Sequence, residues 1–319
     1  MLISIVIPCY RSSKTLPTVI GEIEEVFNNN KKYDYQVILV NDGSPDNTYE
    51  VICDLCEKND KIVGINLSRN FGQARARMAA LPYIKGDCAV YMDDDGQHPA
   101  EGIIPLVEKL SEGYDVVYAK FPQKKASPFK IATSAMYRKF MEMIGGKPKG
   151  IYTSSFLAWS RFAVDSLKKY HSPSPSTGSY LLKVTSRFAN VEVPHRARIA
   201  GKTGYTLGKL FGLAIMGITN FTIIPLRASA VAGMVIAAIG FLYSCFLILR
   251  KLIDPSSVIG YTSIMAAVLL LGGLILISLG IIGEYIGRIY MTLSDMPQYM
   301  VREVVEKKEQ SVLENENEQ

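Results

Sequence analysis

Two long apolar stretches constrain this chain more than any other feature of its sequence. Ala228 to Leu249 and Tyr261 to Ile282 each run for 22 residues without one Asp, Glu, Lys, Arg or His. A helix of that length crosses the hydrocarbon core of a bilayer. We therefore predict a transmembrane hairpin over residues 228–288, which excludes a purely soluble protein. The 48% hydrophobic content also excludes an intrinsically disordered one.

The remaining sequence divides around this hairpin. Residues 1–202 mix charged and apolar residues in the proportions of a globular domain, and residues 289–319 form a polar, acid-rich tail. Between them, residues 203–227 carry apolar side chains at helical spacing with few charges, which predicts amphipathic helices in the membrane interface. A helix packed on the globular domain is the alternative, because the same apolar stripe suits a protein core.

The first residues favour a cytosolic position for the globular domain. Met1 to Ile7 is an apolar run without a basic region or a cleavage site, so it predicts a first strand and not a signal peptide. Two spans return the tail to the side of the globular domain. We expect both on the cytosolic face of the inner membrane, although Arg250 and Lys251 place positive charge in the opposite loop.

Strand-length apolar runs alternate with amphipathic helical patterns through the first 120 residues. This alternation predicts an α/β fold with a mainly parallel sheet, whose ligands bind at the carboxyl ends of the strands. The expected strands are 2–8, 35–40, 61–67, 88–92 and 115–119, and the expected helices are 15–28, 47–58, 72–84 and 99–111.

An apolar strand runs directly into the segment Asp93-Asp94-Asp95-Gly96-Gln97. Clustered carboxylates are costly unless a cation joins them, and hard oxygen ligands suit Mg²⁺ or Mn²⁺. Because residues two apart on an extended segment face the same side, Asp93, Asp95 and Gln97 are expected to converge while Asp94 points elsewhere. An acidic turn that caps the helix beginning near Pro99 is the alternative.

A second strand ends in Asn41-Asp42-Gly43-Ser44, and the first strand ends in Ile7-Pro8-Cys9-Tyr10. Asp42 is a candidate acceptor for a hydrogen bond from a nucleotide base or ribose, although Asp-Gly-Ser is also common turn chemistry. Strand ends at one edge of a sheet meet, so we expect one pocket lined by three of them.

Other functional classes are excluded by what the sequence lacks. The net charge of +5 comes without a basic run interleaved with aromatic residues, which argues against a nucleic-acid partner. No G-x-G-x-x-G follows the first strand, and Gly201-Lys202-Thr203 lacks the first glycine of a phosphate-binding loop. The five cysteines are scattered and odd in number, which predicts reduced thiols.

Four motifs of this sequence occur in the same order as in family-2 glycosyltransferases, which the chain therefore resembles. Together with the hairpin, they resemble the membrane-anchored polyprenyl-phosphate glycosyltransferases, the bacterial relatives of dolichol-phosphate mannose synthase. The motifs are Ser4-Ile5-Val6-Ile7-Pro8-Cys9-Tyr10, Val40-Asn41-Asp42-Gly43-Ser44-Pro45-Asp46-Asn47-Thr48, Ser68-Arg69-Asn70-Phe71-Gly72 and Asp93-Asp94-Asp95-Gly96-Gln97-His98-Pro99. The resemblance implies a GT-A-like nucleotide-diphospho-sugar transferase domain over residues 1–202.

The resemblance also implies roles for individual residues. Those at the nucleotide would be Pro8, Tyr10, Asp42, Gly43 and Asp94, and those at the metal would be Asp93, Asp95 and Gln97. The acceptor phosphate would meet Arg198, Lys202 and, from the preceding loop, Arg138 or Lys130. On this basis the residues of catalysis are Asp93, Asp95, Arg198 and Lys202. Cations that reach lipid head groups are the alternative for Arg198 and Lys202.

Two departures from the family pattern bear on catalysis. Arg11-Ser12-Ser13 stands where carboxylates usually follow the first-strand tyrosine. Tyr152-Thr153-Ser154-Ser155-Phe156 lacks an acidic residue that many members have ahead of the phenylalanine, which removes one candidate catalytic base.

The resemblance therefore implies inverting transfer of a single sugar from a nucleotide-diphosphate sugar, UDP-linked by preference, to polyprenyl (undecaprenyl) phosphate. It also suggests a homo-oligomer. A non-catalytic membrane scaffold on a degenerate transferase fold, which binds nucleotide sugar or partner proteins, is the alternative that the two departures motivate.

Overall fold

The computed structural model describes residues 1–121, 148, 150–172, 175–194, 224–253, 261–294 and 297–307. The chain forms two compact units. Met1–Thr203 and Pro297–Gln319 make up the first, and Gly204–Met296 the second. Each unit is described by itself.

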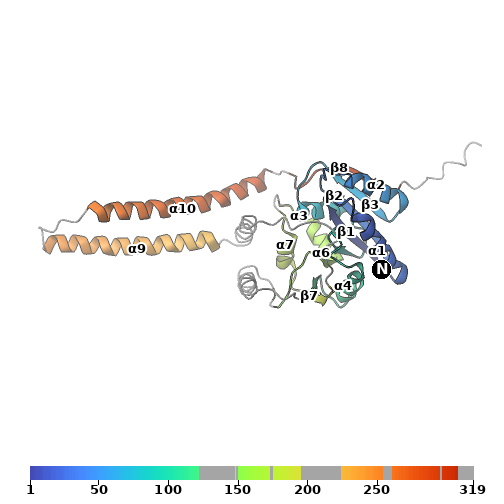
Figure 1. Cartoon of the computed structure of the whole chain (residues 1–319). Helices are drawn as coiled ribbons and strands as arrows, with labels where there is room; N and C mark the ends of the chain where they lie inside the picture. Colours follow the sequence, from blue (N-terminus) through green and yellow to red (C-terminus); the bar gives the residue numbers. More distant parts are fainter. Residues whose placement is uncertain are drawn as a thin grey trace, which may run out of the picture. The chain divides into compact units, whose positions relative to one another are not determined.

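The first unit is built on an eight-stranded sheet in the order β7-β5-β6-β4-β1-β2-β3-β8 (Figure 1). Strand β1 pairs in parallel with β2 and β4, β2 with β3, and β5 with β7, whereas β6 and β8 run antiparallel to their neighbours. The predicted α/β fold with a mainly parallel sheet is confirmed. The strands are β1 (Leu2–Cys9), β2 (Asp34–Asn41), β3 (Ile62–Leu67), β4 (Cys88–Tyr91), β5 (Val116–Lys120), β6 (Leu157–Ser160), β7 (Phe188–Glu192) and β8 (Val301–Glu306).

Helices cover both faces of this sheet, which explains why its central strands are continuous apolar runs. Residues of β1 alternate between two cores, with Ile5 packed among α1, α2 and α4, and Val6 packed among α3, α6 and α7. The helices are α1 (Leu16–Asn29), α2 (Thr48–Lys58), α3 (Gln73–Ala80), α4 (Ile103–Ser111), α6 (Arg161–Lys168) and α7 (Thr177–Val184).

Two helix boundaries differ from the sequence prediction. The helix expected over 72–84 is α3 followed by the 3₁₀ turn Leu81–Tyr83, because Pro82 has no N–H to continue the α-helical pattern. The helix expected from residue 99 begins with the 3₁₀ turn Ala100–Gly102 before α4. Both changes shorten the helix without moving it along the chain.

The carboxy-terminal segment contributes a strand that the sequence analysis did not predict. Residues 289–319 were expected to form a polar tail, yet β8 pairs antiparallel with β3 along the edge of the sheet. The Ser68 N–H donates to the Met300 carbonyl at 2.9 Å, and the Tyr49 hydroxyl donates to the Glu303 carboxylate at 2.7 Å. The chain therefore returns to the first unit after the apolar helices and completes its sheet.

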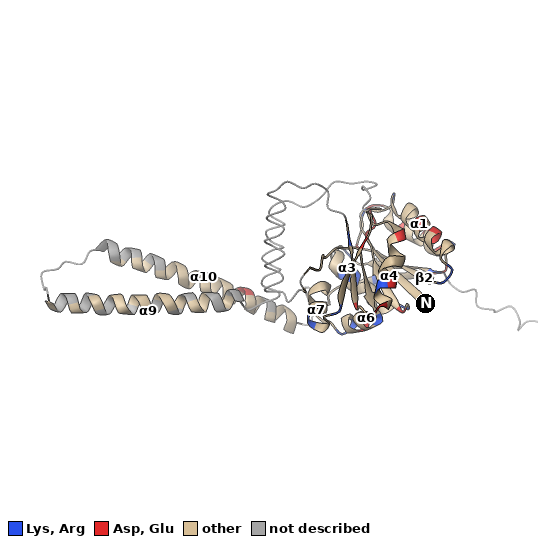
Figure 2. Cartoon of the chain, turned by 90° about the horizontal axis from the view of Figure 1, so that it is seen from below, with Lys and Arg blue, Asp and Glu red and all other residues tan. Residues whose placement is uncertain are grey.

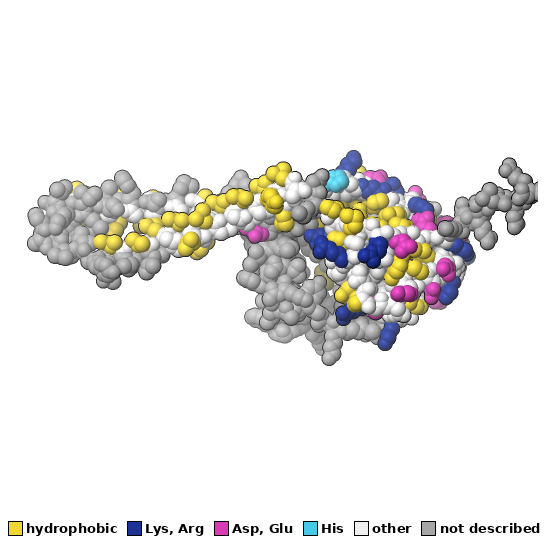
Figure 3. Space-filling model, turned by 90° about the horizontal axis from the view of Figure 1, so that it is seen from above, with side chains coloured by type: hydrophobic (Ala, Val, Ile, Leu, Met, Phe, Trp, Pro, Cys, Tyr) yellow, Lys and Arg dark blue, Asp and Glu magenta, His cyan; other side chains and the backbone are white. Residues whose placement is uncertain are grey.

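The second unit contains the helices α9 (Ile224–Ile253) and α10 (Tyr261–Leu293), which form a hairpin (Figure 1). They contain the predicted spans 228–249 and 261–282. The described parts of both helices are almost free of charged side chains (Figure 2), and hydrophobic side chains follow α10 (Figure 3). Within the described residues, the stretch Leu271–Leu293 is long and apolar enough to cross a membrane. Most of the predicted interfacial segment 203–227 lies outside the described residues.

Candidate active site

Neighbouring strands of the sheet end together and bring the predicted site residues to one edge. Cys9 at the end of β1 lies opposite Asn41 at the end of β2, and Val6 lies opposite Tyr91 at the end of β4. The Asp42 N–H donates to the Cys9 carbonyl at 2.9 Å, which joins the first two strand ends. The residues after β1, β2 and β4 therefore share one site.

Asp42 holds the segment that follows β3. Its side chain is 3% exposed, and its two carboxylate oxygens accept hydrogen bonds from the Phe71 N–H at 2.7 Å and the Gly72 N–H at 2.9 Å. Burial raises the pKa of Asp42, and the two amides oppose this shift. The carboxylate thus fixes the loop that leads into α3.

Gly43 lets this loop approach the end of β2. Its φ is +61°, and a Cβ atom at this position would lie 2.4 Å from the Arg69 carbonyl carbon and 2.5 Å from the Asn70 nitrogen. Both contacts are with backbone, so no side chain could move aside to make room. Asp42 and Gly43 together keep the loop after β3 close to the end of β2. Asp42 binds two of its amides, and Gly43 has no side chain that would push it away.

Asp94 connects the acidic segment to the turn after β1. It accepts hydrogen bonds from the Ser12 hydroxyl and, at 3.1 Å, from the Tyr10 N–H. Burial raises the pKa of Asp94, and the hydrogen bond from Ser12 opposes the shift. The structure therefore places this carboxylate on the first-strand turn, within the stretch Arg11-Ser12-Ser13 where the family pattern leads one to expect carboxylates.

Asp93 points to different partners and is surrounded by donors. Its Oδ1 accepts from the Gln73 side-chain amide at 2.5 Å and lies 3.7 Å from Nη2 of Arg77. Its Oδ2 accepts from the Ser155 hydroxyl at 2.8 Å and lies 3.6 Å from Nε2 of His98. The carboxylate is thereby oriented by α3, by the loop before β6 and by its own loop.

The neighbouring His98 is held in one orientation. It is 5% exposed, and its ring stacks on Phe156 with centroids 4.9 Å apart. Nδ1 accepts the Asp93 N–H at 2.9 Å, so the proton of the neutral ring is on Nε2, which faces Ser155 at 3.4 Å. His98 therefore supports the acidic loop, and its basic nitrogen is already used by the backbone.

The chemistry of the acidic segment suits a divalent ion bound together with a phosphate ligand. The Gln97 N–H donates to Oδ1 of Asp95 at 3.0 Å, which folds the segment back on itself. The described residues contain no group of three His, Cys, Asp or Glu side chains arranged to hold a metal. Mg²⁺ does not require such a group, because it is commonly held by one or two carboxylates and by substrate phosphates. Oxygen donors from Asp93, Asp95 and Gln97 fit that pattern.

The other predicted site residues divide into two sets. Pro8 is buried within β1, and Tyr10 is 45% exposed with the Arg11 guanidinium over its ring. Arg138, Arg198, Lys202 and Lys130 lie outside the described residues. Their assignment to the acceptor phosphate stays a prediction.

Sequence reasoning missed the side chains that contact the carboxylates. Ser12, Gln73, Arg77 and Ser155 contact Asp93 or Asp94 from positions 16 to 82 residues away along the chain. No local pattern marks them. Ser12 follows β1 and Ser155 precedes β6, whereas Gln73 and Arg77 lie in α3.

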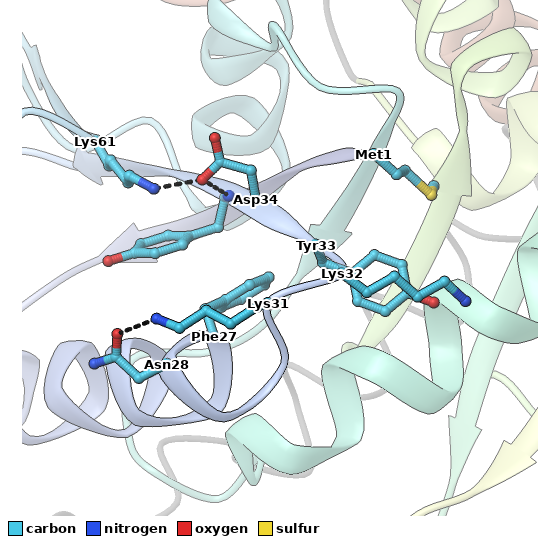
Figure 4. Close-up of a pocket in the computed structure, with 9 residues that line it drawn as sticks. Met1, Phe27, Asn28, Lys31, Lys32, Tyr33, Asp34 and Lys61 are labelled. Carbon is cyan, nitrogen blue, oxygen red and sulfur yellow. Dashed lines mark hydrogen bonds and ion pairs between the residues drawn. The ribbon is translucent and has the colours of Figure 1, made fainter.

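A separate pocket lies at the opposite edge of the sheet, near the first residues of β1 and β2 (Figure 4). It has a volume of about 300 Å³. Lys61 pairs with Asp34 and lies 4.7 Å from the centre of the Tyr35 ring. Lys31 donates a hydrogen bond to Oδ1 of Asn28 at 3.4 Å, and the Lys32 ammonium lies 5.2 Å from the centre of the Tyr33 ring. These lysines are explained by local stability, and the pocket is far along the strands from the acidic segment.

The comparison of this chain with known proteins agrees with the site geometry. The model of glycosyl transferase family 2 matches residues 4–167, and the model of the GtrB C-terminal hairpin matches residues 224–289. The chain belongs to glycosyl transferase family 2. This glycosyltransferase therefore combines the catalytic domain of the family with a membrane hairpin, as its sequence motifs led us to expect.

Two curated relatives resemble the family-2 enzyme over nearly its whole length. A prophage bactoprenol glucosyl transferase homolog of Escherichia coli is 32% identical over 95% of this chain and 99% of its own. An undecaprenyl-phosphate 4-deoxy-4-formamido-L-arabinose transferase of Aeromonas hydrophila is 32% identical over 95% of this chain and 94% of its own.

A solved structure shares the fold of the first unit. Glucosyl-3-phosphoglycerate synthase of Mycobacterium tuberculosis, determined with Mn²⁺ and UDP-glucose, matches with a TM-score of 0.50 and 20% identity. The match covers 68% of this chain and 77% of the synthase. It supports the GT-A-like fold of this glycosyltransferase.

Proposed function

We propose that this glycosyltransferase transfers one sugar, with inversion, from a UDP-linked donor to polyprenyl phosphate at the cytosolic face of the inner membrane. The observation that carries the proposal is that hydrogen bonds of Asp42 and Asp94 join the segments after β1, β2 and β4 at one edge of the sheet, next to Asp93, in a chain that also has the hairpin. Relatives named for bactoprenol and undecaprenyl phosphate support the acceptor class.

The donor would lie across the ends of β1 and β2. The exposed ring of Tyr10 offers a surface on which a base can stack, and Gly43 keeps the neighbouring backbone close. Asp95, Gln97 and Asp93 would hold Mg²⁺ or Mn²⁺ against the diphosphate. When bound, the ion would neutralise the negative charge that develops on the leaving nucleotide diphosphate.

The state of His98 favours an acceptor that needs no catalytic base. Because Nδ1 accepts a backbone N–H, the ring has no free basic nitrogen to deprotonate an alcohol. Ser155 is likewise a donor to Asp93. A phosphate monoester has a second pKa of about 6 and is already largely a dianion at neutral pH. It can therefore attack the anomeric carbon directly, and a single displacement inverts the configuration.

The polyprenyl chain of such an acceptor stays in the bilayer, so the enzyme must work at the membrane surface. The hairpin provides this anchor. We assign Arg198, Lys202 and Arg138 to the acceptor phosphate. The donor is also anionic, so cations are needed to hold the two close together.

The test is an assay of the full chain in detergent with undecaprenyl phosphate, Mg²⁺ or Mn²⁺ and a panel of UDP-, GDP- and dTDP-sugars. We expect one chelator-sensitive lipid-linked sugar by mass spectrometry, with inverted anomeric configuration by NMR. Asp95→Ala should lower kcat at least ~100-fold, since it removes a charge that acts in the transition state. Asp165→Ala is the matched control, because Asp165 only pairs with Arg161 and Lys168 on α6.

Two results would contradict the proposal. Full activity of Asp95→Ala with normal metal dependence would show that the acidic segment is assigned wrongly. Metal-dependent UDP binding without any lipid product, for every donor tested, would favour the membrane scaffold instead.

A further inference from the structure

An arginine that takes no part in the proposed chemistry lies buried beside the acidic segment. The Arg77 side chain is 12% exposed, and its Nη2 lies 3.7 Å from Oδ1 of Asp93. Its Nε and Nη2 atoms have no hydrogen-bond partner among the residues that the structure describes. The guanidinium lies 5.8 Å from the centre of the Tyr91 ring. Arg77 is therefore a buried cation that forms an ion pair with the Asp93 carboxylate, in which Nη2 lies too far away for a hydrogen bond.

Such an arrangement is a poor way to stabilise a fold. Burying a guanidinium is costly, and unpaired N–H groups add to the cost. Asp93 does not need Arg77 for its orientation, because Gln73 and Ser155 already donate to its two oxygens. What Arg77 contributes to Asp93 is a positive charge, which an arginine keeps even when buried.

The charge has a clear consequence for the acidic segment. Three adjacent carboxylates, Asp93, Asp94 and Asp95, are accompanied by the buried charge of Arg77. Together they leave two negative charges, which one divalent cation balances. Without Arg77 the segment would attract free divalent ions more strongly and would repel the anionic nucleotide diphosphate.

We propose that Arg77 tunes the acidic segment to accept a divalent ion together with the nucleotide diphosphate and to resist a free divalent ion. Arg77 acts through Asp93, the carboxylate that its Nη2 faces at 3.7 Å, and is therefore a positioning residue. The inference rests on the proposed function, since it concerns the metal that the donor requires. It explains why a costly cation is retained where hydrogen bonds already orient the carboxylate.

The test measures Mn²⁺ binding to the full chain in detergent by the electron paramagnetic resonance signal of the free ion, with and without UDP. For Arg77→Met we expect free Mn²⁺ to bind about fivefold more tightly than to the wild type. UDP in the presence of chelator should bind several-fold more weakly. Arg77→Lys places an ammonium group beside the Asp93 carboxylate, which favours its charged form, and should stay within about twofold of the wild type in both measurements.

Controls separate this role from a structural one. Arg187→Met removes an exposed arginine next to β7 and should leave Mn²⁺ binding unchanged. A purely structural role predicts a lower melting temperature for Arg77→Met without tighter Mn²⁺ binding. We expect the melting temperature to be equal or higher, since replacing a buried charge with an apolar residue is often neutral or stabilising. Arg77→Gln is a second neutral variant if Arg77→Met does not fold.

The possible failures are distinguishable. If wild-type protein binds UDP but never Mn²⁺, the proposed metal site is wrong and the inference falls with it. If the wild type binds Mn²⁺ with UDP and Asp95→Ala does not, the metal site stands. Unchanged Mn²⁺ affinity in Arg77→Met, or equal tightening in Arg77→Lys, would then overturn the inference alone.

Discussion

At the scale of single residues, the carboxylates of Asp42, which is buried, and Asp94, which is partly buried, bind groups of the protein itself. Asp42 accepts two loop amides, and Asp94 accepts an amide and a hydroxyl from the turn after β1. Burial raises the pKa of both groups. A carboxylate in such a place is retained because its hydrogen bonds fix the positions of segments that come from separate strands.

Gly43 gives the residue-scale prediction. Gly43→Ala adds a Cβ atom that would lie 2.4 Å from backbone, at a φ of +61°. We expect it to destabilise the first unit by about 2–4 kcal/mol and to weaken UDP binding at least ~10-fold, because the loop after β3 must move away from Asp42. Trp159, the only tryptophan, lies in β6 and reports thermal unfolding of this unit by fluorescence.

Gly72→Ala is the matched control for that variant. Gly72 also has a positive φ, +89°, but a Cβ atom there would have nothing within 4 Å. This variant carries the cost of backbone strain alone, about 1–3 kcal/mol, because a φ of +89° with a ψ of 153° is a conformation that is essentially restricted to glycine. Equal losses of stability in the two variants would contradict the close approach at Gly43.

At the scale of secondary-structure elements, periodicity predicted the first half of the fold. β1 to β5 and α1 to α4 were all expected, because strands buried on both faces and amphipathic helices leave regular local patterns. The strands β6, β7 and β8 were missed. β6 is only four residues long, and β8, Val301 to Glu306, does not alternate apolar and charged residues and lies within a polar segment. Their pairing depends on partners far away in the sequence.

The candidate site divides in the same way. Carboxylates that directly follow a strand, such as Asp42 and Asp93, could be predicted because a parallel sheet brings its strand ends together. The donors to those carboxylates could not. Ser155 reaches Asp93 across 62 residues, and Ser12 reaches Asp94 across 82 residues, through contacts that only the folded chain defines.

Strand β8 provides the prediction at this scale. Val305 is half-buried and packs against the core under α1, α2 and α4, whereas its neighbour Val304 is 36% exposed. Val305→Asn should lower the free energy of unfolding by about 1–2 kcal/mol, because it places an amide on an apolar surface. Val304→Asn should change it by less than about 0.5 kcal/mol. Tryptophan fluorescence during heating measures both.

A similar loss for the two variants would mean that β8 does not present one face to the core. If neither variant changes the unfolding temperature, the segment after the hairpin is not part of the cooperative sheet. Tyr49→Phe, which removes the hydrogen bond to Glu303, offers an independent check with an expected cost of about 1 kcal/mol.

At the scale of the whole molecule, the chain leaves the first unit, forms the hairpin and returns to complete the sheet. The segments Met1–Thr203 and Pro297–Gln319, on either side of the second unit along the chain, both belong to the first unit. Because β8 pairs with β3 at the edge of the sheet, the hairpin is an insertion between two parts of one domain and not a terminal extension. Damage to the hairpin is therefore expected to affect the anchoring of the enzyme more than the folding of its catalytic domain.

The exposed apolar surface of α10 makes this expectation testable. Ile275 and Leu279 are 59% and 56% exposed, and both lie inside the predicted span 261–282 and inside the apolar stretch Leu271–Leu293. Each arginine at the centre of a span costs about 2.5–3.5 kcal/mol. The double variant Ile275→Arg/Leu279→Arg should therefore leave the membrane pellet on washing with alkaline carbonate, whereas the wild type and Ile275→Leu/Leu279→Ile should stay. Tryptophan fluorescence should show the same unfolding of the first unit in all three. Full retention of the double arginine variant would mean that these side chains do not face lipid.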